Sequence, residues 1–207
     1  MDDNNILGVI LAGGKSKRFG EDKKHVKLGT KTLLEHVITK IQSKFKTLLI
    51  ISNDNLNINI SKNIKIIPDC INGNLGPLVG VLSAMEWIKK NNMPYDWIAT
   101  FPSDTPFFDV SIIESYKKKI CSGNSLLYFI KSNEKRHNIF GLWSIKLVET
   151  LENDLVNNNF RKVENWANKI GVETLNFKFD KFDPFLNINT KEDLIKAEKI
   201  LEKYKND

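Results

Sequence analysis

The stretch Gly8-Val-Ile-Leu-Ala-Gly-Gly-Lys-Ser-Lys-Arg-Phe-Gly-Glu-Asp-Lys23 carries the strongest signal for the fold of this chain. Residues 9–11 are an apolar run that predicts a short buried strand, and this signal stops at Gly13-Gly14. Glycines let backbone N–H groups approach a phosphate closely, because no Cβ is in the way. The cations that follow would neutralise phosphate charge: Lys15, Lys17, Arg18 and Lys23. This combination favours a loop that holds nucleotide phosphates over an ordinary solvated turn.

The loop differs from two other phosphate-binding patterns. It has no Gly-Lys-Ser/Thr after four spacer residues, as in a Walker loop, and no Gly-x-Gly-x-x-Gly dinucleotide fingerprint. It resembles instead the nucleotidyltransferase signature Leu-Ala-Gly-Gly-x-Ser-x-Arg-Met-Gly-x-x-Lys. Leu11–Lys23 match this signature, with Phe19 in place of the usual Met. The substitution keeps a large apolar side chain at that position.

Composition limits the classes of protein to consider. The formal charge of +6 suits an anionic ligand, but the lysines are spread along the chain, which makes nucleic acid an unfavoured partner. The two cysteines, Cys70 and Cys121, show no metal-ligand spacing, which favours a reducing compartment. Asp2-Asp3-Asn4-Asn5 does not fit a signal peptide, and no apolar run reaches the roughly 18 residues of a membrane span. We therefore expect a cytoplasmic protein without a membrane segment.

Strand-like and helix-like segments alternate in the first half of the chain. The expected strands are Leu7–Leu11, Thr47–Ser52, Ile64–Ile67 and Trp97–Phe101. The expected helices are Thr32–Lys44, Pro77–Lys90 and Ser111–Ile120. The unbroken apolar run at residues 48–51 is typical of a strand that is buried on both faces of a parallel sheet. This order predicts a three-layer α/β fold: a mostly parallel sheet with helices on both faces.

The second half is less regular. We expect strands at Leu126–Ile130 and Asn138–Ser144, separated by a charged turn over Ser132–Arg136. The remaining expected elements are helices at Val148–Leu155, Phe160–Lys169 and Thr190–Tyr204, and a strand at Glu173–Phe177. Since no internal repeat or long linker divides the chain, residues 1–207 are predicted to form one domain.

Asp104 is the second residue that indicates chemistry. It follows the fourth predicted strand, in Phe101-Pro-Ser-Asp-Thr-Pro106. Ligands of open α/β sheets bind outside the carboxyl ends of the strands, where the glycine-rich loop also lies. Mg²⁺ prefers carboxylates together with phosphate oxygens and water. We therefore favour a magnesium site at Asp104 over a helix cap or an Asx turn.

Further polar residues follow other predicted strands. Asp69 comes after the third strand and would either accept hydrogen bonds from a base or ribose or end the strand in a turn. Gly80, in the helix that begins near Gly76, would leave space for a ligand. Asn187 and Asn189 precede the last helix, where their amides would meet a substrate rich in heteroatoms or cap the helix.

Arg136 lies beside His137 between two predicted strands. The pair would meet an anionic substrate or lie in a solvated turn, and we lean slightly toward the turn.

Together, these motifs resemble the molybdenum cofactor guanylyltransferase family. They are Leu11–Lys23, Asp69–Gly80, Pro102–Pro106 and Asn187–Leu194, and they span nearly the whole chain. The resemblance implies a Rossmann-like fold in which residues 1–106 bind the nucleotide and residues 107–207 face the second substrate. It implies transfer of GMP from GTP-Mg²⁺ to the terminal phosphate of molybdopterin-bound molybdenum cofactor, with release of pyrophosphate. GTP and the molybdopterin cofactor would be its substrates, and a molybdoenzyme or cofactor-insertion protein would be a further partner.

The resemblance also implies roles for individual residues. Those expected to bind the nucleotide are Leu11, Ala12, Gly13, Gly14, Lys15, Lys23, Asp69, Gly80, Asp104 and, after the second strand, Ser52 or Asn53. Lys23, Arg18 and Asp104 would be catalytic, and Asp104 would also bind Mg²⁺. Residues expected to bind the second substrate are Arg136, Asn187 and Asn189. Asn138 stands where the family commonly has proline, so this substrate-side loop is expected to differ.

The sequence is compatible with three other functions. Cytidylyltransferases that act on molybdopterin tend to have Leu-Ala-Ala-Gly, whereas Gly13 removes a methyl group and gives the larger purine room. An enzyme that makes a nucleotide sugar is a second alternative. A catalytically silent nucleotide-binding or regulatory subunit is a third, although the presence of Asp104, Lys23 and Arg18 argues against it.

Overall fold

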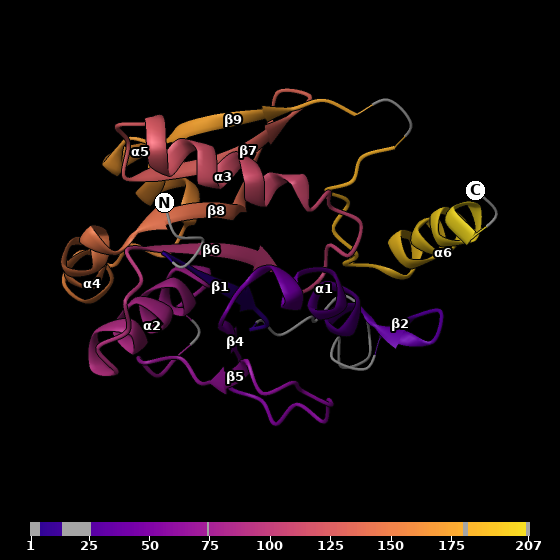
Figure 1. Cartoon of the computed structure of the whole chain (residues 1–207), viewed down its shortest axis with the longest axis horizontal. Coiled ribbons are helices and arrows are strands. Elements are labelled where there is room, and N and C mark those ends of the chain that lie inside the picture. Colours follow the sequence, from indigo (N-terminus) through magenta and orange to yellow (C-terminus); the bar gives the residue numbers. More distant parts are fainter. Residues whose placement is uncertain (1–4, 14–25, 74, 180–181, 206–207) are drawn as a thin grey trace.

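The computed structural model describes residues 5–13, 26–73, 75–179 and 182–205 (Figure 1). A seven-stranded sheet lies at its centre, in the order β5-β4-β1-β6-β8-β7-β9. Its strands are β1 (Ile6–Leu11), β4 (Leu48–Ile51), β5 (Ile64–Ile67), β6 (Trp97–Pro102), β7 (Leu127–Ser132), β8 (Lys135–Ser144) and β9 (Glu173–Phe177). The α-helices are α1 (Leu33–Ile41), α2 (Pro77–Lys90), α3 (Ser111–Ser122), α4 (Val148–Val156), α5 (Val163–Ile170) and α6 (Lys191–Lys205). Short 3₁₀ turns follow α1 (Gln42–Lys44) and precede α4 (Ile145–Leu147).

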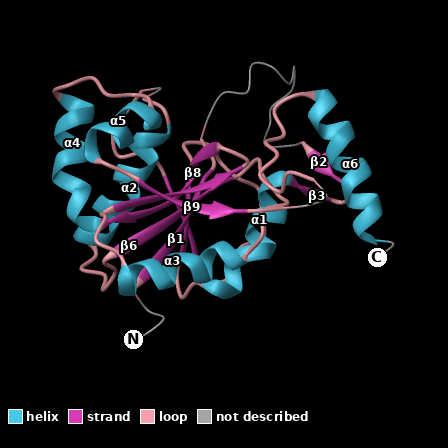
Figure 2. Cartoon of the chain, turned by 90° about the horizontal axis from the view of Figure 1, so that it is seen from above, coloured by secondary structure: helices cyan, strands magenta, loops and turns pink. Residues whose placement is uncertain are grey.

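The central strand β1 is covered on both faces. It pairs in parallel with β4 on one side and with β6 on the other. Leu7 and Val9 belong to a core that is completed by α2, α4 and α5, whereas Ile6 and Ile10 belong to a core completed by α1 and α3. Figure 2 shows these helices on the two faces of the sheet. The predicted three-layer α/β fold is confirmed.

The strand order reverses at β1. The chain passes through α1 to β4 on one side of β1, and from β5 through α2 to β6 on its other side. Ligands of such sheets bind in the crevice where the strand order reverses, outside the carboxyl ends. Hydrogen bonds join the neighbouring strand ends there: Ala12 N–H donates to Ile51 O (3.0 Å), and Ser103 N–H donates to Leu11 O (3.3 Å). The loops after β1, β4 and β6 therefore begin at one shared edge.

The turn between β7 and β8 is shorter than predicted. It consists of Asn133 and Glu134, with φ of 44° and 61°, and Ser132 pairs with Lys135 across it. Two successive residues with positive φ reverse the chain as a type I′ hairpin, whose twist matches that of the flanking strands. The predicted charged turn over Ser132–Arg136 is therefore wrong: β8 begins at Lys135 and includes Arg136.

β8 contains a bulge that changes which side chains share a face. Phe129 pairs with Gly141, but the next residue, Ile130, pairs with His137, so residues 138–140 are left out of the pairing. In a regular strand, residues three apart point to opposite faces. Here His137 and Phe140 lie on the same face, with ring centroids 6.4 Å apart.

A small subassembly stands beside the sheet. The antiparallel strands β2 (Lys27–Leu28) and β3 (Lys31–Thr32), which the sequence did not predict, lie next to α6 (Figures 1 and 2). A third apolar cluster joins them, made of Val26, Leu28, Leu33, Ile188 and Ala197. Residues from both ends of the chain thus share one core. In the described ranges, no helix is long and apolar enough to cross a membrane.

The other predicted elements are present, with ends that differ by a few residues. Helix α1 begins after Thr32, whose Oγ1 accepts a hydrogen bond from Glu35 N–H, while the Glu35 carboxylate accepts one from Thr32 N–H. This capping box fixes the start of the helix. Helix α5 begins at Val163 rather than at the predicted Phe160.

We expect Gly8→Ala to lower the free energy of unfolding by roughly 1–3 kcal/mol, a typical cost of overpacking a core. A Cβ at Gly8 would lie 2.6 Å from Phe45 Cδ2 and 2.9 Å from Leu48 Cδ1. Urea titration measures the loss. Gly13→Ala is the matched control, because no described atom lies within 4 Å of its added Cβ. Equal losses in both variants would contradict the packing argument.

Candidate active site

The predicted nucleotide-binding residues begin at the carboxyl end of β1. Leu11 ends this strand, and Ala12 and Gly13 follow it, with Ala12 N–H bonded to Ile51 O at the end of β4. Gly13 is exposed, and the described part of the chain places nothing within 4 Å of where its Cβ would be. The rest of this loop lies outside the described residues, including Gly14, Lys15, Arg18 and Lys23. Their roles stay predictions.

Asn53 and Asp69 form a pair of hydrogen bonds across the ends of β4 and β5. Asn53 Nδ2 donates to Asp69 Oδ2 (2.7 Å), and Asp69 N–H donates to Asn53 Oδ1 (2.9 Å). Burial raises the pKa of Asp69, and the hydrogen bond from Asn53 opposes that rise. Ser52 is buried, and its Oγ accepts a hydrogen bond from Asp54 N–H (3.2 Å). Of the two residues that the sequence left open, Asn53 therefore presents its side chain at this edge.

Gly80 brings α2 close to the ends of β1 and β4. A Cβ at this position would lie 2.9 Å from Leu11 Cδ2, 3.4 Å from Ile51 Cγ2 and 3.7 Å from Asp69 Oδ1. The side chain of Leu11 therefore takes up the space that the sequence analysis assigned to a ligand. The glycine permits close helix–strand packing and places Asp69 beside the first turns of α2. A contact between Gly80 and the nucleotide stays a prediction.

Asp104 and Asn187, predicted as separate motifs, lie together. Thr105 Oγ1 is 3.1 Å from Asp104 Oδ1 and 2.5 Å from Asn187 Oδ1, although Thr105 and Asn187 are 82 residues apart. Ile188 N–H also donates to Asp104 O (2.9 Å). Thr105 is fully buried at this junction. Sequence reasoning missed Thr105, whose only signal was its place directly after Asp104.

The carboxylate of Asp104 suits a hard cation. Mg²⁺ is commonly held by one or two carboxylates, while substrate phosphates and water supply its remaining oxygen ligands. Asp104 lies just beyond the carboxyl end of β6, at the edge where the glycine-rich loop begins. Among the residues that the structure describes, no group of three or more His, Cys, Asp or Glu side chains could hold a metal ion. The role of Asp104 as a metal ligand stays a prediction.

Asn189 lies at the start of α6. Asp193 Oδ2 accepts hydrogen bonds from Asn189 N–H and Thr190 N–H, both at 3.1 Å, and Thr190 Oγ1 accepts one from Asp193 N–H (3.2 Å). Thr190 therefore caps the helix, as its spacing from Asp193 predicts. Asn187 takes no part in these capping bonds, since its side chain faces Thr105.

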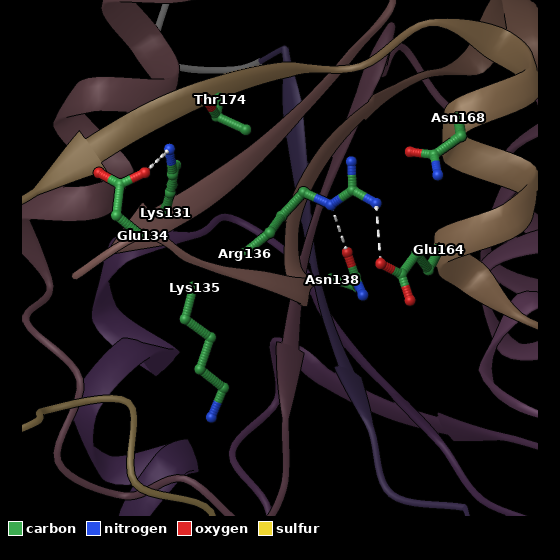
Figure 3. A pocket seen from close by; sticks show the side chains of 8 residues that line it. All are labelled: Lys131, Glu134, Lys135, Arg136, Asn138, Glu164, Asn168 and Thr174. Carbon is green, nitrogen blue, oxygen red and sulfur yellow. Dashed lines mark hydrogen bonds and ion pairs between the residues drawn. The ribbon is translucent and has the colours of Figure 1, made fainter.

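Arg136 lines a pocket of about 600 Å³ between the β7–β8 hairpin and α5 (Figure 3). β7 and β6 are both antiparallel to β8, so the hairpin turn lies at the same edge of the sheet as the end of β6. Arg136 Nε donates to Asn138 Oδ1 (2.8 Å), and its Nη2 is 3.8 Å from Glu164 Oε1. The other residues that line the pocket are Lys131, Glu134, Lys135, Asn168 and Thr174. The guanidinium is thus oriented by its neighbours rather than free in a solvated turn.

His137 faces the other side of β8 and is buried. Its Nε2 is hydrogen-bonded to Ser132 Oγ (2.6 Å), and its ring stacks on Phe185 at a centroid distance of 4.4 Å. Burial lowers the pKa of His137 to about 4; the charge of Asp183 opposes this change and that of Lys135 adds to it. The imidazole is therefore neutral at physiological pH. The sequence analysis treated His137 and Arg136 as one pair, but His137 packs on Phe185 whereas Arg136 lines the pocket beside α5.

The chain matches a known protein family and is similar to proteins of that family over nearly its whole length. The model of the MobA-like NTP transferase domain matches residues 8–170. A protein from Rhizobium rhizogenes named molybdenum cofactor guanylyltransferase is 33% identical over 205 residues, which cover 97% of this chain and 94% of that protein. The match therefore includes the segments that carry Asp69, Asp104 and Asn187.

Solved structures show the same fold. Molybdopterin-guanine dinucleotide biosynthesis protein A from Archaeoglobus fulgidus superposes with a TM-score of 0.74 at 21% identity, covering 95% of this chain and 99% of its own. The 4-diphosphocytidyl-2C-methyl-D-erythritol synthase from Anaerococcus prevotii gives 0.71 at 13% identity, covering 97% and 100%. At these identities, the likeness concerns the fold alone.

We expect stability to fall as the pH drops from about 6.5 to about 4, in part because of His137. In this window the unfolded chain takes up a proton that the folded protein does not, so protonation favours unfolding. Above this window both states are neutral at His137, and below it both are charged. Urea unfolding at several pH values measures the decline. His137→Phe should make it shallower, and an unchanged pH slope in that variant would show that His137 does not contribute.

Proposed function

The chain belongs to the MobA-like NTP transferase family, and from this premise we propose that it is a molybdenum cofactor guanylyltransferase. It transfers GMP from GTP to the terminal phosphate of the molybdopterin-bound molybdenum cofactor and releases pyrophosphate. The observation that carries this proposal is the nearly full-length match to the Rhizobium rhizogenes protein of that name. A direct test incubates the purified protein with GTP, Mg²⁺ and molybdopterin cofactor, measures pyrophosphate and identifies the dinucleotide product by mass.

The reaction suits the residues at the site. An oxygen of the acceptor phosphate forms a bond to the α-phosphorus of GTP, and the bond from that phosphorus to the bridging oxygen of the β-phosphate breaks. The acceptor phosphate is already ionised at neutral pH, so the reaction requires no general base. The barrier comes from repulsion between the negative groups and from the need to align the acceptor oxygen with the α-phosphorus. Cations and fixed hydrogen-bond donors lower such a barrier by positioning and by charge stabilisation.

The nucleotide would lie along the carboxyl ends of β1, β4 and β5. Leu11, Ala12 and Gly13 would contact it directly, and Asp69, held by Asn53, would accept hydrogen bonds from the guanosine part. The proposed phosphate-binding residues are Gly14, Lys15, Arg18 and Lys23. Lys23, the last of these, would stabilise the charge that develops on the departing pyrophosphate. The support for these roles is the match of Leu11–Lys23 to the nucleotidyltransferase signature.

Asp104 is the proposed magnesium ligand. Magnesium, when bound, would neutralise phosphate charge and hold the triphosphate in place. The hydrogen bond from Ile188 N–H to Asp104 O fixes the backbone that carries this carboxylate. Thr105 Oγ1 is within hydrogen-bond distance of both Asp104 Oδ1 and Asn187 Oδ1, so Asn187 lies close to Asp104. This supports a role for Asn187 and Asn189 in binding the acceptor.

Arg136, whose side chain lies on the face of β8 opposite to His137, is proposed to bind the acceptor. Its pocket is also lined by Lys131 and Lys135 as further cations, and the hairpin turn beside it lies at the same edge of the sheet as the end of β6. We further propose that the protein is cytoplasmic and that a molybdoenzyme or cofactor-insertion protein receives its product. A cysteine content of two, without metal-ligand spacing, supports a reducing compartment.

Asp104→Asn should lower turnover roughly 100-fold or more, because it removes a charge that acts in the transition state while it keeps the shape of the side chain. Pyrophosphate release at saturating GTP measures the loss, and the melting temperature shows whether the variant stays folded. Asp109→Asn is the matched control on the same loop: Asp109 Oδ1 accepts a hydrogen bond from Ser111 N–H, which asparagine also accepts. A folded Asp104→Asn variant with near-normal turnover at limiting Mg²⁺ rules out this metal ligand.

Gly13→Ala should reduce kcat/KM for GTP by about 10–200-fold, the usual effect of one methyl group in a pocket. Within the described part of the chain, the space beside Gly13 is open, so the methyl group would reach toward the bound base. CTP use should not rise strongly, because cytosine would still lack hydrogen-bond partners. Steady-state rates with both nucleotides measure the ratio, and an unaltered GTP/CTP ratio would show that base selectivity lies elsewhere, for example around Asp69.

A further inference from the structure

We propose that His137 and Phe185 are positioning residues, which hold the segment of residues 183–189 against the sheet so that Asn187 stays aligned with Asp104. The inference rests on the proposed function, in which Asp104 serves the metal and Asn187 serves the acceptor. The sequence motifs assigned no role to Phe185, and they considered His137 only together with Arg136, as a contact for an anionic substrate.

Phe185 anchors one end of the segment. It is 1% exposed and lies among aromatic rings from β8 and β9. Its ring is stacked on His137 (4.4 Å between centroids, 26° between planes) and meets Phe140 edge-on (5.1 Å) and Phe177 edge-on (6.4 Å). Asp183 Oδ1 accepts a hydrogen bond from Phe185 N–H (2.8 Å), which fixes the turn before it. Aromatic pairs of this kind stabilise beyond the area that they bury.

The bulge in β8 lets His137 and Phe140 approach Phe185 from the same face of the strand. In a regular strand, His137 and Phe140 would point to opposite faces, but the pairing of β8 with β7 skips residues 138–140. The hydrogen bond between Ser132 Oγ and His137 Nε2 (2.6 Å) then holds the imidazole across the hairpin. Burial lowers the pKa of His137 to about 4, so the ring is neutral at physiological pH. It stacks on Phe185 as an aromatic side chain.

The other end of the segment is fixed at β6. Ile188 is fully buried and its N–H donates to Asp104 O, while Thr105 Oγ1 bonds to Asn187 Oδ1. Asn187 thus lies between two anchors, two residues after Phe185 and one before Ile188. A loss of the aromatic anchor would let the segment shift along the sheet edge. Displacements of about 1 Å at a reacting centre can cost roughly 100-fold in rate.

Three variants test the proposal against a matched control. Phe185→Leu and His137→Ala remove the stack, whereas His137→Phe keeps a stacking ring and removes only the hydrogen bond to Ser132. Phe45→Leu is the control: Phe45 is buried in the same apolar cluster, but it packs on Phe101 and against Gly8. Each variant is measured for melting temperature, for hydrogen–deuterium exchange of residues 182–190, and for KM and kcat with acceptor and with GTP.

We expect Phe185→Leu and His137→Ala to speed exchange in residues 182–190 and to lower kcat/KM for the acceptor by roughly 10–100-fold, with KM for GTP unchanged. His137→Phe should recover most of both effects. Phe45→Leu should lower the melting temperature without changing exchange in this segment or the kinetics of the acceptor. A merely structural role of Phe185 predicts no such difference between the two leucine variants.

The proposal is overturned if exchange in residues 182–190 is unchanged in Phe185→Leu and His137→Ala, or if Phe45→Leu alters exchange and acceptor kinetics to the same degree. Should Phe185→Leu fail to fold, His137→Ala against His137→Phe makes the same comparison. Exchange does not depend on which reaction is catalysed. Absence of GMP transfer by the wild-type protein would therefore refute the proposed function separately, while the exchange data still decide whether the anchor exists.

Discussion

Burial of β1 on both of its faces is the constraint on which the rest of the structure depends. A strand without an exposed face has to be covered by helices above and below the sheet. Leu7 and Val9 pack toward α2 while Ile6 and Ile10 pack toward α1, so the two crossovers of the chain lie on opposite faces. The strand order reverses there as a result, and the crevice at the carboxyl end of β1 is a consequence of this packing.

The second half of the chain completes that crevice through a few directed contacts. The hairpin of β7 and β8 extends the sheet beyond β6 and presents Arg136 on one face and His137 on the other. The segment of residues 183–189 then crosses back to β6, where Thr105 bonds to Asn187. Residues from distant motifs meet because the sheet brings together strand ends that are far apart along the chain. The candidate site is therefore an assembly of short loops on a rigid frame.

Most elements could be predicted because their signals are local. The apolar run of residues 48–51 and the helical spacing in α1 each depend on neighbouring residues alone. The β7–β8 turn was predicted too long because the structure places Glu134 at positive φ, which is uncommon for residues other than glycine and which charge and polarity do not reveal. The pair β2 and β3 was missed because each of these strands has only two residues. The packing of Leu11 against Gly80 could not be predicted, since nothing in the sequence indicates it.

By itself, the sequence determined the fold class, the family and the edge of the sheet at which the predicted site residues lie. Apolar periodicity, the glycine-rich signature and the position of Asp104 after a strand are all local features of the sequence. Only the tertiary structure decided which polar groups meet. It paired Asn53 with Asp69, joined Asn187 to Asp104 through the buried Thr105, and turned His137 toward Phe185. These contacts depend on strand register and on the bulge in β8, and register is set by packing between residues that are distant in the sequence.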